Sequence, residues 1–349
     1  MISLPPQMPS SLTTAIQFSV DCLQAACGMA ARWEARGPVG SDAKPDGSRV
    51  TEIDYAVQAY VGRQLASCLP NDVLVAEEGV SLLKKNPLAL ERALSCLSTL
   101  VPEAEERSVI EWLGRGEGMP GSRHWLLDPV DSTNGLLAGG LYCLNLALVE
   151  NGRVEMAVIG LPKPFVPWFP APNVTSGYLY LAVRGAGSWW APLDESIPFM
   201  RLQVSNQTDV AKAVRLRSLA RTDPRQTKKD ARRRAKVSKA FGEEGGHIRA
   251  PAPIRYPLLA VGQADLYIHL DSSAGRRGRK APKGMKAWDH AAGSLLVEEA
   301  GGRVTDLAGR PLDFSTGRIL SNNRGLLASN GQVHPAALEL LRRIGEGKG

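Results

Sequence analysis

The chain has 349 residues, of which 44% are hydrophobic and 22% charged, so it is long enough for one large domain or two medium ones. No apolar stretch is long enough to span a bilayer, and the proline-containing start resembles neither a secretory signal nor a transit peptide. These features exclude a membrane-spanning protein and lead us to expect a globular one.

The net charge of +7 is unevenly distributed along the chain. Residues 209–240 contain twelve Lys or Arg and three Asp, and a second basic segment covers residues 275–286. Such clusters suit a polyanionic partner or substrate, but a solvated basic helix face is the simpler explanation. No aromatic residue lies between these charges to stack on bases, so we do not expect nucleic-acid binding.

The five cysteines are odd in number and have no metal-site spacing. Their apolar neighbours favour buried free thiols in a reducing compartment. We therefore expect a cytoplasmic protein, with free thiols at Cys22, Cys27, Cys68, Cys96 and Cys143.

The first elements are two predicted helices and a short strand. Apolar residues recur at helical spacing over residues 12–33, and a second helix begins at Thr51, which places Asp54 in its first turn. The apolar run 73–76 predicts a strand that ends at Glu77. Asp54 and Glu77 thus lie at the ends of neighbouring elements.

The middle of the chain reads as a mainly helical stretch, residues 82–112, followed by strands. Asn151-Gly152 is a strong signal for a two-residue hairpin turn. The predicted strands cover residues 125–127, 141–149, 154–161 and 178–183. This pattern is typical of a sheet rich in antiparallel pairs.

The second half alternates between strands and helices. Strand-like segments at 214–219 and 258–270 flank the basic helix, and a helix over 288–300 ends at Gly301-Gly302. Short strands at 303–306 and 326–329 and a terminal helix at 334–344 follow. The predicted class is α/β: an α+β domain over residues 1–204 and an α/β domain over residues 205–349.

Acidic residues follow the predicted strand at 125–127. Asp128 and Asp131 flank Pro129, which fixes part of the turn, so both carboxylates can point to one side with the Val130 carbonyl between them. Such oxygens are the ligands of Mg2+. Ser132 and Thr133 then open a helix or turn whose amide groups suit a phosphate.

Each acidic patch also has a simpler explanation. An Asp-rich turn often caps a helix, Glu77-Glu78 can be a solvated pair, and Asp289 can be an N-cap worth about 1 kcal/mol. Only the combination of the three patches indicates a metal-dependent phosphoryl-transfer site.

The combined motifs resemble the inositol monophosphatase superfamily of lithium-sensitive, Mg2+-dependent phosphatases. The resemblance rests on residues 76–78, 128–133 and 288–293 and extends from about residue 12 to the terminal helix. Residues 44–55 and 301–314 are similar to the 3'(2'),5'-bisphosphate nucleotidase branch. The resemblance implies a layered αβαβα sandwich of the sugar phosphatase type.

The resemblance also implies the metal ligands. One Mg2+ would be held by Glu77, Asp128 and the Val130 carbonyl, and a second by Asp128, Asp131 and Asp289. A third, weaker ion near Glu77 is common in the family, so two to three ions are expected, with inhibition by Li+. The first ion would activate the attacking water, and the second would stabilise the leaving oxygen.

The same resemblance assigns the remaining roles. Asp54, Glu77 and Thr133 are the catalytic candidates, with Asp54 and Thr133 orienting the water. Ser132 and Thr133 would bind phosphate, but family members nearly always have Gly at the position of Ser132. Glycine tolerates unusual dihedral angles there, and a positive φ at serine would cost roughly 1–3 kcal/mol.

The nucleotide-binding segment departs further from the branch. Residues 251–256 keep only a basic residue and a tyrosine, Arg255 and Tyr256, and His269 stands where the branch has arginine. A His-Ser pair expected near Thr222 is absent. The three residues Arg255, Tyr256 and His269 remain the candidates for substrate contact, and the basic segments could supply the lost phosphate contacts.

The expected function is hydrolysis of the 3'-phosphate of adenosine 3',5'-bisphosphate, with 3'-phosphoadenylyl sulfate as a second candidate substrate. A phosphatase of inositol phosphates or other sugar phosphates is the alternative within this chemistry. A weakly active nucleotide or polyanion sensor is the alternative of another class, supported by Ser132 and the altered segment 251–256. We expect a monomer or homodimer that acts on a small phosphorylated substrate.

Overall fold

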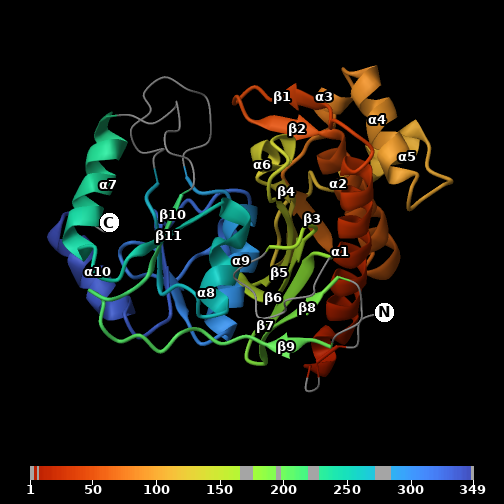
Figure 1. Ribbon diagram of the computed structural model, residues 1–349. Coiled ribbons are helices and arrows are strands. Elements are labelled where there is room, and N and C mark those ends of the chain that lie inside the picture. The colour runs from red at the N-terminus through yellow and green to blue at the C-terminus, as the bar shows by residue number, and fades with distance from the viewer. Residues whose placement is uncertain are drawn as a thin grey trace.

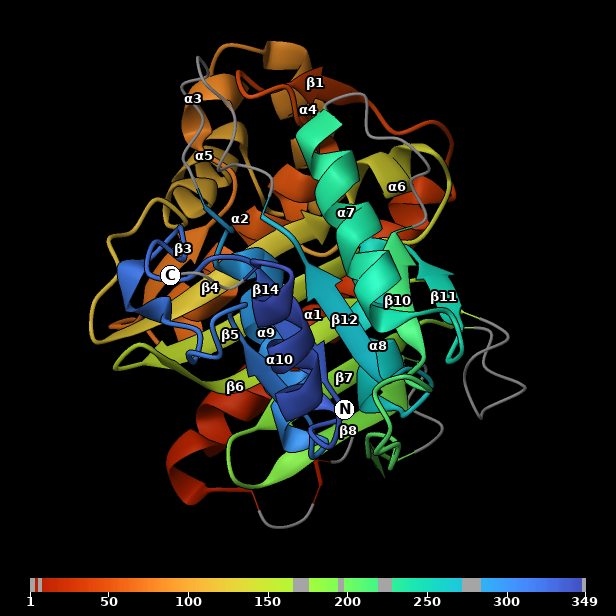
Figure 2. The ribbon, with the colours of Figure 1, turned by 90° about the vertical axis from the view of Figure 1, so that its left-hand side faces the viewer.

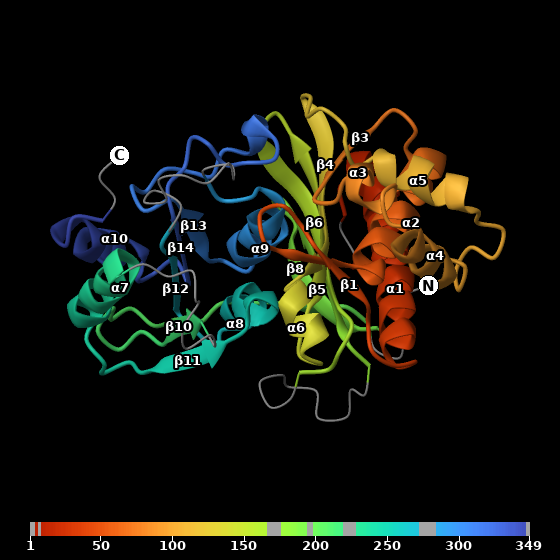
Figure 3. The same ribbon diagram turned by 90° about the horizontal axis from the view of Figure 1, so that it is seen from above.

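The computed structural model describes residues 4–5, 8–165, 176–193, 198–218, 228–271 and 284–346. Two sheets with helices between and outside them form five layers (Figures 1 and 3). The predicted αβαβα sandwich is confirmed. The division into domains at residues 204 and 205 stays a prediction.

The first outer layer consists of helices α1 (Thr13–Glu34), α2 (Glu52–Cys68), α3 (Val80–Leu83), α4 (Pro87–Leu97) and α5 (Glu106–Gly114). A small hairpin, β1 (Ser41–Ala43) with β2 (Arg49–Thr51), connects α1 to α2. The side chain of Thr51 and that of Asp54 form a capping box at the start of α2, which explains why the helix begins there.

The seven-stranded sheet has the order β3-β4-β5-β6-β7-β8-β9, and only β3 and β4 are parallel to each other. The expected antiparallel-rich part is therefore confirmed. The strands are β3 (Val73–Ala76), β4 (Arg123–Asp131), β5 (Cys143–Glu150), β6 (Arg153–Leu161), β7 (Tyr178–Val183), β8 (Gly187–Pro192) and β9 (Met200–Arg201). The predicted hairpin turn is present, with positive φ at Asn151 and Gly152.

The middle layer consists of α8 (Arg255–Ala260) and α9 (Trp288–Glu299). Helix α9 contacts strands of both sheets and is apolar on nearly all sides, since Leu295, Leu296 and Val297 are all buried. A helix with no solvent face fixes the distance between the sheets.

The second sheet has the order β11-β10-β12-β14-β13 and is mixed. Its strands are β10 (Arg215–Ser218), β11 (His247–Ala250), β12 (Leu266–His269), β13 (Arg303–Thr305) and β14 (Leu326–Ser329). Helices α7 (Lys228–Phe241) and α10 (His334–Arg343) cover its outer face (Figure 2).

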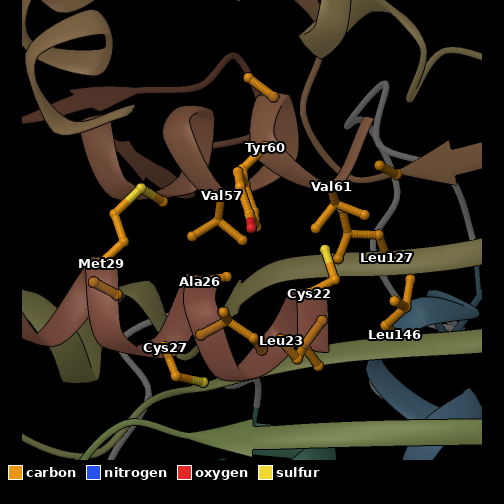
Figure 4. Packing of buried hydrophobic residues seen from close by; sticks show 14 of the residues in the cluster. Cys22, Leu23, Ala26, Cys27, Met29, Val57, Tyr60, Val61, Leu127 and Leu146 are labelled. Carbon is orange, nitrogen blue, oxygen red and sulfur yellow. The ribbon is translucent and has the colours of Figure 1, made fainter. Parts of the chain in front are cut away.

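One apolar core lies between the outer helices and the first sheet (Figure 4). Side chains of α1 interdigitate there with those of α2 and with Leu127 and Leu146 of the sheet. A second core joins the other face of this sheet to α8, α9 and the second sheet. The two sheets therefore share a core.

One expectation about the strands was wrong in part. Residues 258–270 are not one strand-like segment, because Leu258, Leu259 and Ala260 end α8 and only Leu266–His269 form a strand. A short apolar run that packs between two sheets has the same sequence pattern whether it forms a helix or a strand. Residue 219, predicted to end a strand, lies outside the described residues.

The expectation of buried thiols was wrong for Cys68, which is exposed at the end of α2. The other four cysteines are buried and free. Cys143 has polar neighbours, since its thiol donates to Asp131 Oδ2 at 3.8 Å and to Asn145 Oδ1 at 3.6 Å. No helix in the part of the chain that the structure describes is long and apolar enough to cross a membrane.

Candidate active site

The parallel strands β3 and β4 bring the first two acidic patches together. Glu77 follows β3, and its amide donates to the Leu127 carbonyl at 3.2 Å, so it lies directly beside Asp128 in β4. The pairing of β4 with β5 is broken between Asp128 and Asp131, where the Val130 amide donates to Asp128 Oδ1 at 3.1 Å. Strand β4 thus extends through both aspartates, and its irregular end sets their directions.

Ser132 adopts the left-handed conformation, with φ 74° and ψ 50°, immediately before the short helix α6 (Thr133–Leu137). The positive φ confirms the geometric concern raised by serine at this position. A β-carbon on Gly135 would lie 2.6 Å from Ser132 Oγ, so the turn is tightly packed. The hydroxyl of Ser132 forms no cap to the helix.

Thr133 and Asp54 meet across this turn. The Thr133 hydroxyl lies 3.2 Å from the Val130 carbonyl and 3.4 Å from Asp54 Oδ1. Asp54 is 1% exposed and accepts hydrogen bonds from the amide and hydroxyl of Thr51. Burial raises the pKa of Asp54 to about 7, although the hydrogen bonds from Thr51 lower it. The negative charge of Glu77 adds to the rise. Such a carboxylate can take a proton near neutral pH.

Two lysines hold Glu77. Its Oε1 atom lies 2.8 Å from Lys44 Nζ and 3.0 Å from Lys286 Nζ, and Lys44 also lies 2.7 Å from Glu78 Oε1. Burial would raise the pKa of Glu77, but the two ammonium groups outweigh it and the pKa is lowered. Burial and the neighbouring Glu77 raise the pKa of Glu78 to about 8.

Helix α9 places Asp289, in its first turn, beside the end of β4. Burial raises the pKa values of Asp128 and Asp289 well above their ordinary range, and the surrounding carboxylates add to the rise. Burial also raises the pKa of Asp131 to about 6 although Arg255 opposes it. Buried Asp128 and half-buried Asp131 and Asp289 therefore share one crowded, negatively charged space.

This charge crowding tests whether the residues suit Mg2+. All the donors are carboxylate or carbonyl oxygens, the ligands of a hard cation, and a divalent ion would relieve their repulsion. In the described residues no three acidic, His or Cys side chains are posed as a metal-binding group. Glu77 is turned to Lys44 and Lys286 instead. The donor set fits Mg2+ in its chemistry, and binding requires the Glu77 side chain to exchange partners.

A pocket of about 310 Å³ opens beside the aspartates. Its lining includes Asp131 and Asp289 together with all three predicted substrate-contact residues, Arg255, Tyr256 and His269. Burial lowers the pKa of His269 to about 4, so its imidazole is neutral at pH 7. Asp54, Glu77 and Asp128 are not part of this lining, but Glu77 contacts Lys286, which is.

Arg255 and Tyr256 are fixed by neighbours. Arg255 donates to the Ala250 carbonyl and to the Tyr267 hydroxyl, each at 3.2 Å. The Tyr256 hydroxyl lies 2.8 Å from His290 Nδ1. A β-carbon on Gly293 would lie 2.1 Å from the Tyr256 ring, so this position of α9 must be glycine for the ring to pack there. These contacts hold both side chains in place in the pocket wall.

Sequence reasoning missed the roles of Lys44 and Lys286. Lys286 was counted only as part of a basic segment, and Lys44 only as part of a motif. A basic residue three positions before Asp289 is the single signal in the sequence, and it does not indicate a contact with Glu77, 209 positions away. The predicted site residues of both halves are otherwise brought to one place.

Comparisons with known proteins agree with this geometry. The profile of the Inositol monophosphatase family matches residues 12–346. The 3'(2'),5'-bisphosphate nucleotidase of Emericella nidulans is 32% identical over 339 residues, which cover 89% of this chain and 92% of that protein.

Solved structures share the fold. An inositol monophosphatase from Thermotoga maritima covers 95% of this chain with a TM-score of 0.63 at 19% identity, and 98% of that protein is matched. An inositol monophosphatase/NADP phosphatase solved with Mg2+ and phosphate covers 97% with a TM-score of 0.60 at 18% identity, over 98% of its own chain. The family predicted from the motifs is confirmed: the chain belongs to the inositol monophosphatase family.

Proposed function

We propose that this protein is a Mg2+-dependent phosphatase that removes the 3'-phosphate of adenosine 3',5'-bisphosphate, and of 3'-phosphoadenylyl sulfate. The observation that carries the proposal is the convergence of buried Asp128 with half-buried Asp131 and Asp289 beside a pocket whose lining also contains Arg255 and Lys286. Crowded carboxylates next to cationic side chains suit a metal-bound phosphate ester. The relative from Emericella nidulans, matched over 92% of its length, bears the name of this activity.

The proposed metal ligands come from three places in the chain. Bound Mg2+ supplies Lewis-acid activation of a water and neutralises charge at the phosphoryl group. Two to three ions and inhibition by Li+ are part of the proposal. The residues that would hold the ions are Glu77, Asp128, the Val130 carbonyl, Asp131 and Asp289.

Asp54 and Thr133 would manage the proton of the attacking water. The Thr133 hydroxyl, between the Val130 carbonyl and Asp54 Oδ1, can accept a hydrogen bond from water while it donates to Asp54. With a pKa of about 7, Asp54 can take the proton through this hydroxyl. The amides of Ser132 and Thr133 would face the phosphate. No side-chain nucleophile is required.

The test is phosphate release from adenosine 3',5'-bisphosphate, 3'-phosphoadenylyl sulfate and inositol phosphate, each with Mg2+ and with or without Li+. We expect release from the nucleotides only, abolished by chelation of the metal. Preference for inositol phosphate would favour the sugar phosphate alternative, and nucleotide binding without any release would favour the sensor. A cytoplasmic location and a monomeric or homodimeric state remain predictions.

A further inference from the structure

A second pocket, of about 540 Å³, adjoins the first and shares Arg255, Tyr267 and His269 with it. Its lining comes mainly from β10, β12 and helix α7, with one residue each from β11 and α8, and Figure 2 shows how these elements are arranged. Leu216, Val237 and Leu266 contribute an apolar floor. A ligand held at Asp131 and Asp289 could therefore extend past Arg255 into this second space.

The lining of the second pocket is strongly basic. None of its described lining residues is acidic, and it contains five guanidinium groups. We call this space the arginine pocket; its arginines are Arg215, Arg217, Arg234, Arg249 and Arg255. They come from β10, α7, β11 and α8, so the cluster is assembled by the fold and is not a property of one helix face.

Three of the arginines are already held by the protein, Arg255 through the hydrogen bonds described above and Arg215 and Arg217 through Glu243. Arg217 donates to Glu243 Oε1 and to Ser238 Oγ, each at 2.8 Å, and Arg215 lies 3.6 Å from Glu243 Oε2. Glu243 is not part of the pocket lining. This single carboxylate therefore orients two guanidinium groups and neutralises one charge.

Arg234 and Arg249 differ from these three. Both are exposed, and neither forms a hydrogen bond or an ion pair with another described residue. A planar guanidinium with free donors binds phosphate in a two-pronged geometry. His269, at the junction of the two pockets, is neutral and adds no charge there.

We propose that the arginine pocket binds the phosphate of the substrate that is not hydrolysed, and that Arg234 and Arg249 select doubly phosphorylated nucleotides over monophosphates. This inference rests on the proposed function and adds specificity residues outside segment 251–256. The basic helix α7 is then part of the substrate site and not only a solvated surface.

The decisive experiment separates binding from turnover. Adenosine 5'-monophosphate, which has no 3'-phosphate to lose, is titrated calorimetrically in EDTA at low ionic strength. The wild type and the control Arg232→Gln, an exposed arginine of α7 outside the lining, should bind alike. Arg234→Gln and Arg249→Gln should each weaken binding about tenfold, as loss of a charge-assisted hydrogen bond does.

Kinetics give the second readout. In the double variant the KM for adenosine 3',5'-bisphosphate should rise by the same factor at unchanged kcat, while adenosine 3'-monophosphate is hydrolysed as by the wild type. Unchanged binding of adenosine 5'-monophosphate, or equal losses on both substrates, would overturn the assignment. If inorganic phosphate competed for the pocket as well as adenosine 5'-monophosphate does, the pocket would be a site for free phosphate, and the assignment would be overturned too. Absence of turnover in the wild type would refute the proposed phosphatase, and the calorimetric comparison would still decide the pocket.

Discussion

Lys286 Nζ lies 3.0 Å from Glu77 Oε1, and this contact joins the segment before α9 to the end of β3. Lys44 approaches the same oxygen from the β1–β2 hairpin. The negative charge of the site is thus partly balanced by two ammonium groups from distant parts of the chain. Mg2+ must compete with these groups for Glu77.

The variant Lys286→Met tests this competition. Removing one ammonium group should lower the stability of the metal-free protein, by about 1 kcal/mol or less because the lysine is 33% exposed. The rise in Tm on adding Mg2+ should then be larger than in the wild type, because the ion no longer competes with the Lys286 ammonium group and supplies the positive charge that the variant lacks. Thermal unfolding with and without Mg2+ measures both. Lys85→Met, at an exposed lysine, is the control, and an equal Mg2+ effect in the two variants would contradict the idea.

Asp128→Asn should abolish turnover and leave the fold intact. Asp128 is 2% exposed and surrounded by other carboxylates, so the neutral amide removes a ligand and relieves repulsion at once. We expect a loss of kcat beyond the roughly 10–100-fold typical of partners that only support a metal ligand. The Tm in EDTA should stay equal or rise. Activity near the wild-type level would remove Asp128 from the proposed ligands.

Ser132→Gly should stabilise the protein and keep or raise its activity. With φ at 74°, serine occupies a conformation that costs roughly 1–2 kcal/mol for most L residues, and the extra freedom of glycine in the unfolded chain returns part of the gain. A net gain of about 0.5–1 kcal/mol is expected from denaturant unfolding.

Asn151→Gly is the matched control for this variant, because Asn151 also has positive φ, at 50°, but asparagine tolerates it. Its effect should be smaller than that of Ser132→Gly. A large drop in turnover in Ser132→Gly would show that the serine has a positive role in catalysis.

Most of the fold was predictable from the sequence because local patterns determine it. The capping box at Thr51, the hairpin at Asn151-Gly152 and the apolar spacing of α1 are all interactions between near neighbours. The resemblance that indicated the site residues extends from about residue 12 to the terminal helix, and the roles it assigns to them stay predictions.

The rest depended on contacts between distant segments. No local pattern shows that Lys286 lies on Glu77, or that Arg217, Arg234 and Arg249 line one space. Helix α8 was missed because its apolar residues lie on all sides of it and therefore show neither helical nor alternating spacing. The sequence therefore indicated the acidic residues of the site but not the cationic side chains that balance them.

The stability of the metal-free protein should fall as pH rises. Burial raises the pKa values of Asp54 to about 7, Glu78 to about 8 and Asp131 to about 6, all above their ordinary values. Between the ordinary and the raised values the folded state binds more protons than the unfolded chain, so stability is lost as these protons dissociate.

Measurement of Tm in EDTA between about pH 7 and pH 8, where Asp54 and Glu78 lose their protons, checks this trend. Glu77, His269 and His334 have lowered pKa values and act in the opposite sense only at more acidic pH, outside this window. Mg2+ should flatten the decline, because it takes the place of the dissociated protons. A metal-free Tm that rises toward pH 8 would contradict the charge crowding inferred for the site.

The fragment 1–204 should not fold stably by itself. The face of its sheet that bears Leu126, Ala147 and Ile159 is covered by α9 in a core shared with the second sheet. Without residues 205–349 this apolar face would be exposed, and large exposed apolar patches lead to association or aggregation. We expect low soluble yield, strong binding of a hydrophobic dye and no cooperative unfolding. Co-expression with residues 205–349 should restore a soluble, cooperatively unfolding complex, whereas a monomeric fragment with a sharp transition would show that the two parts fold independently.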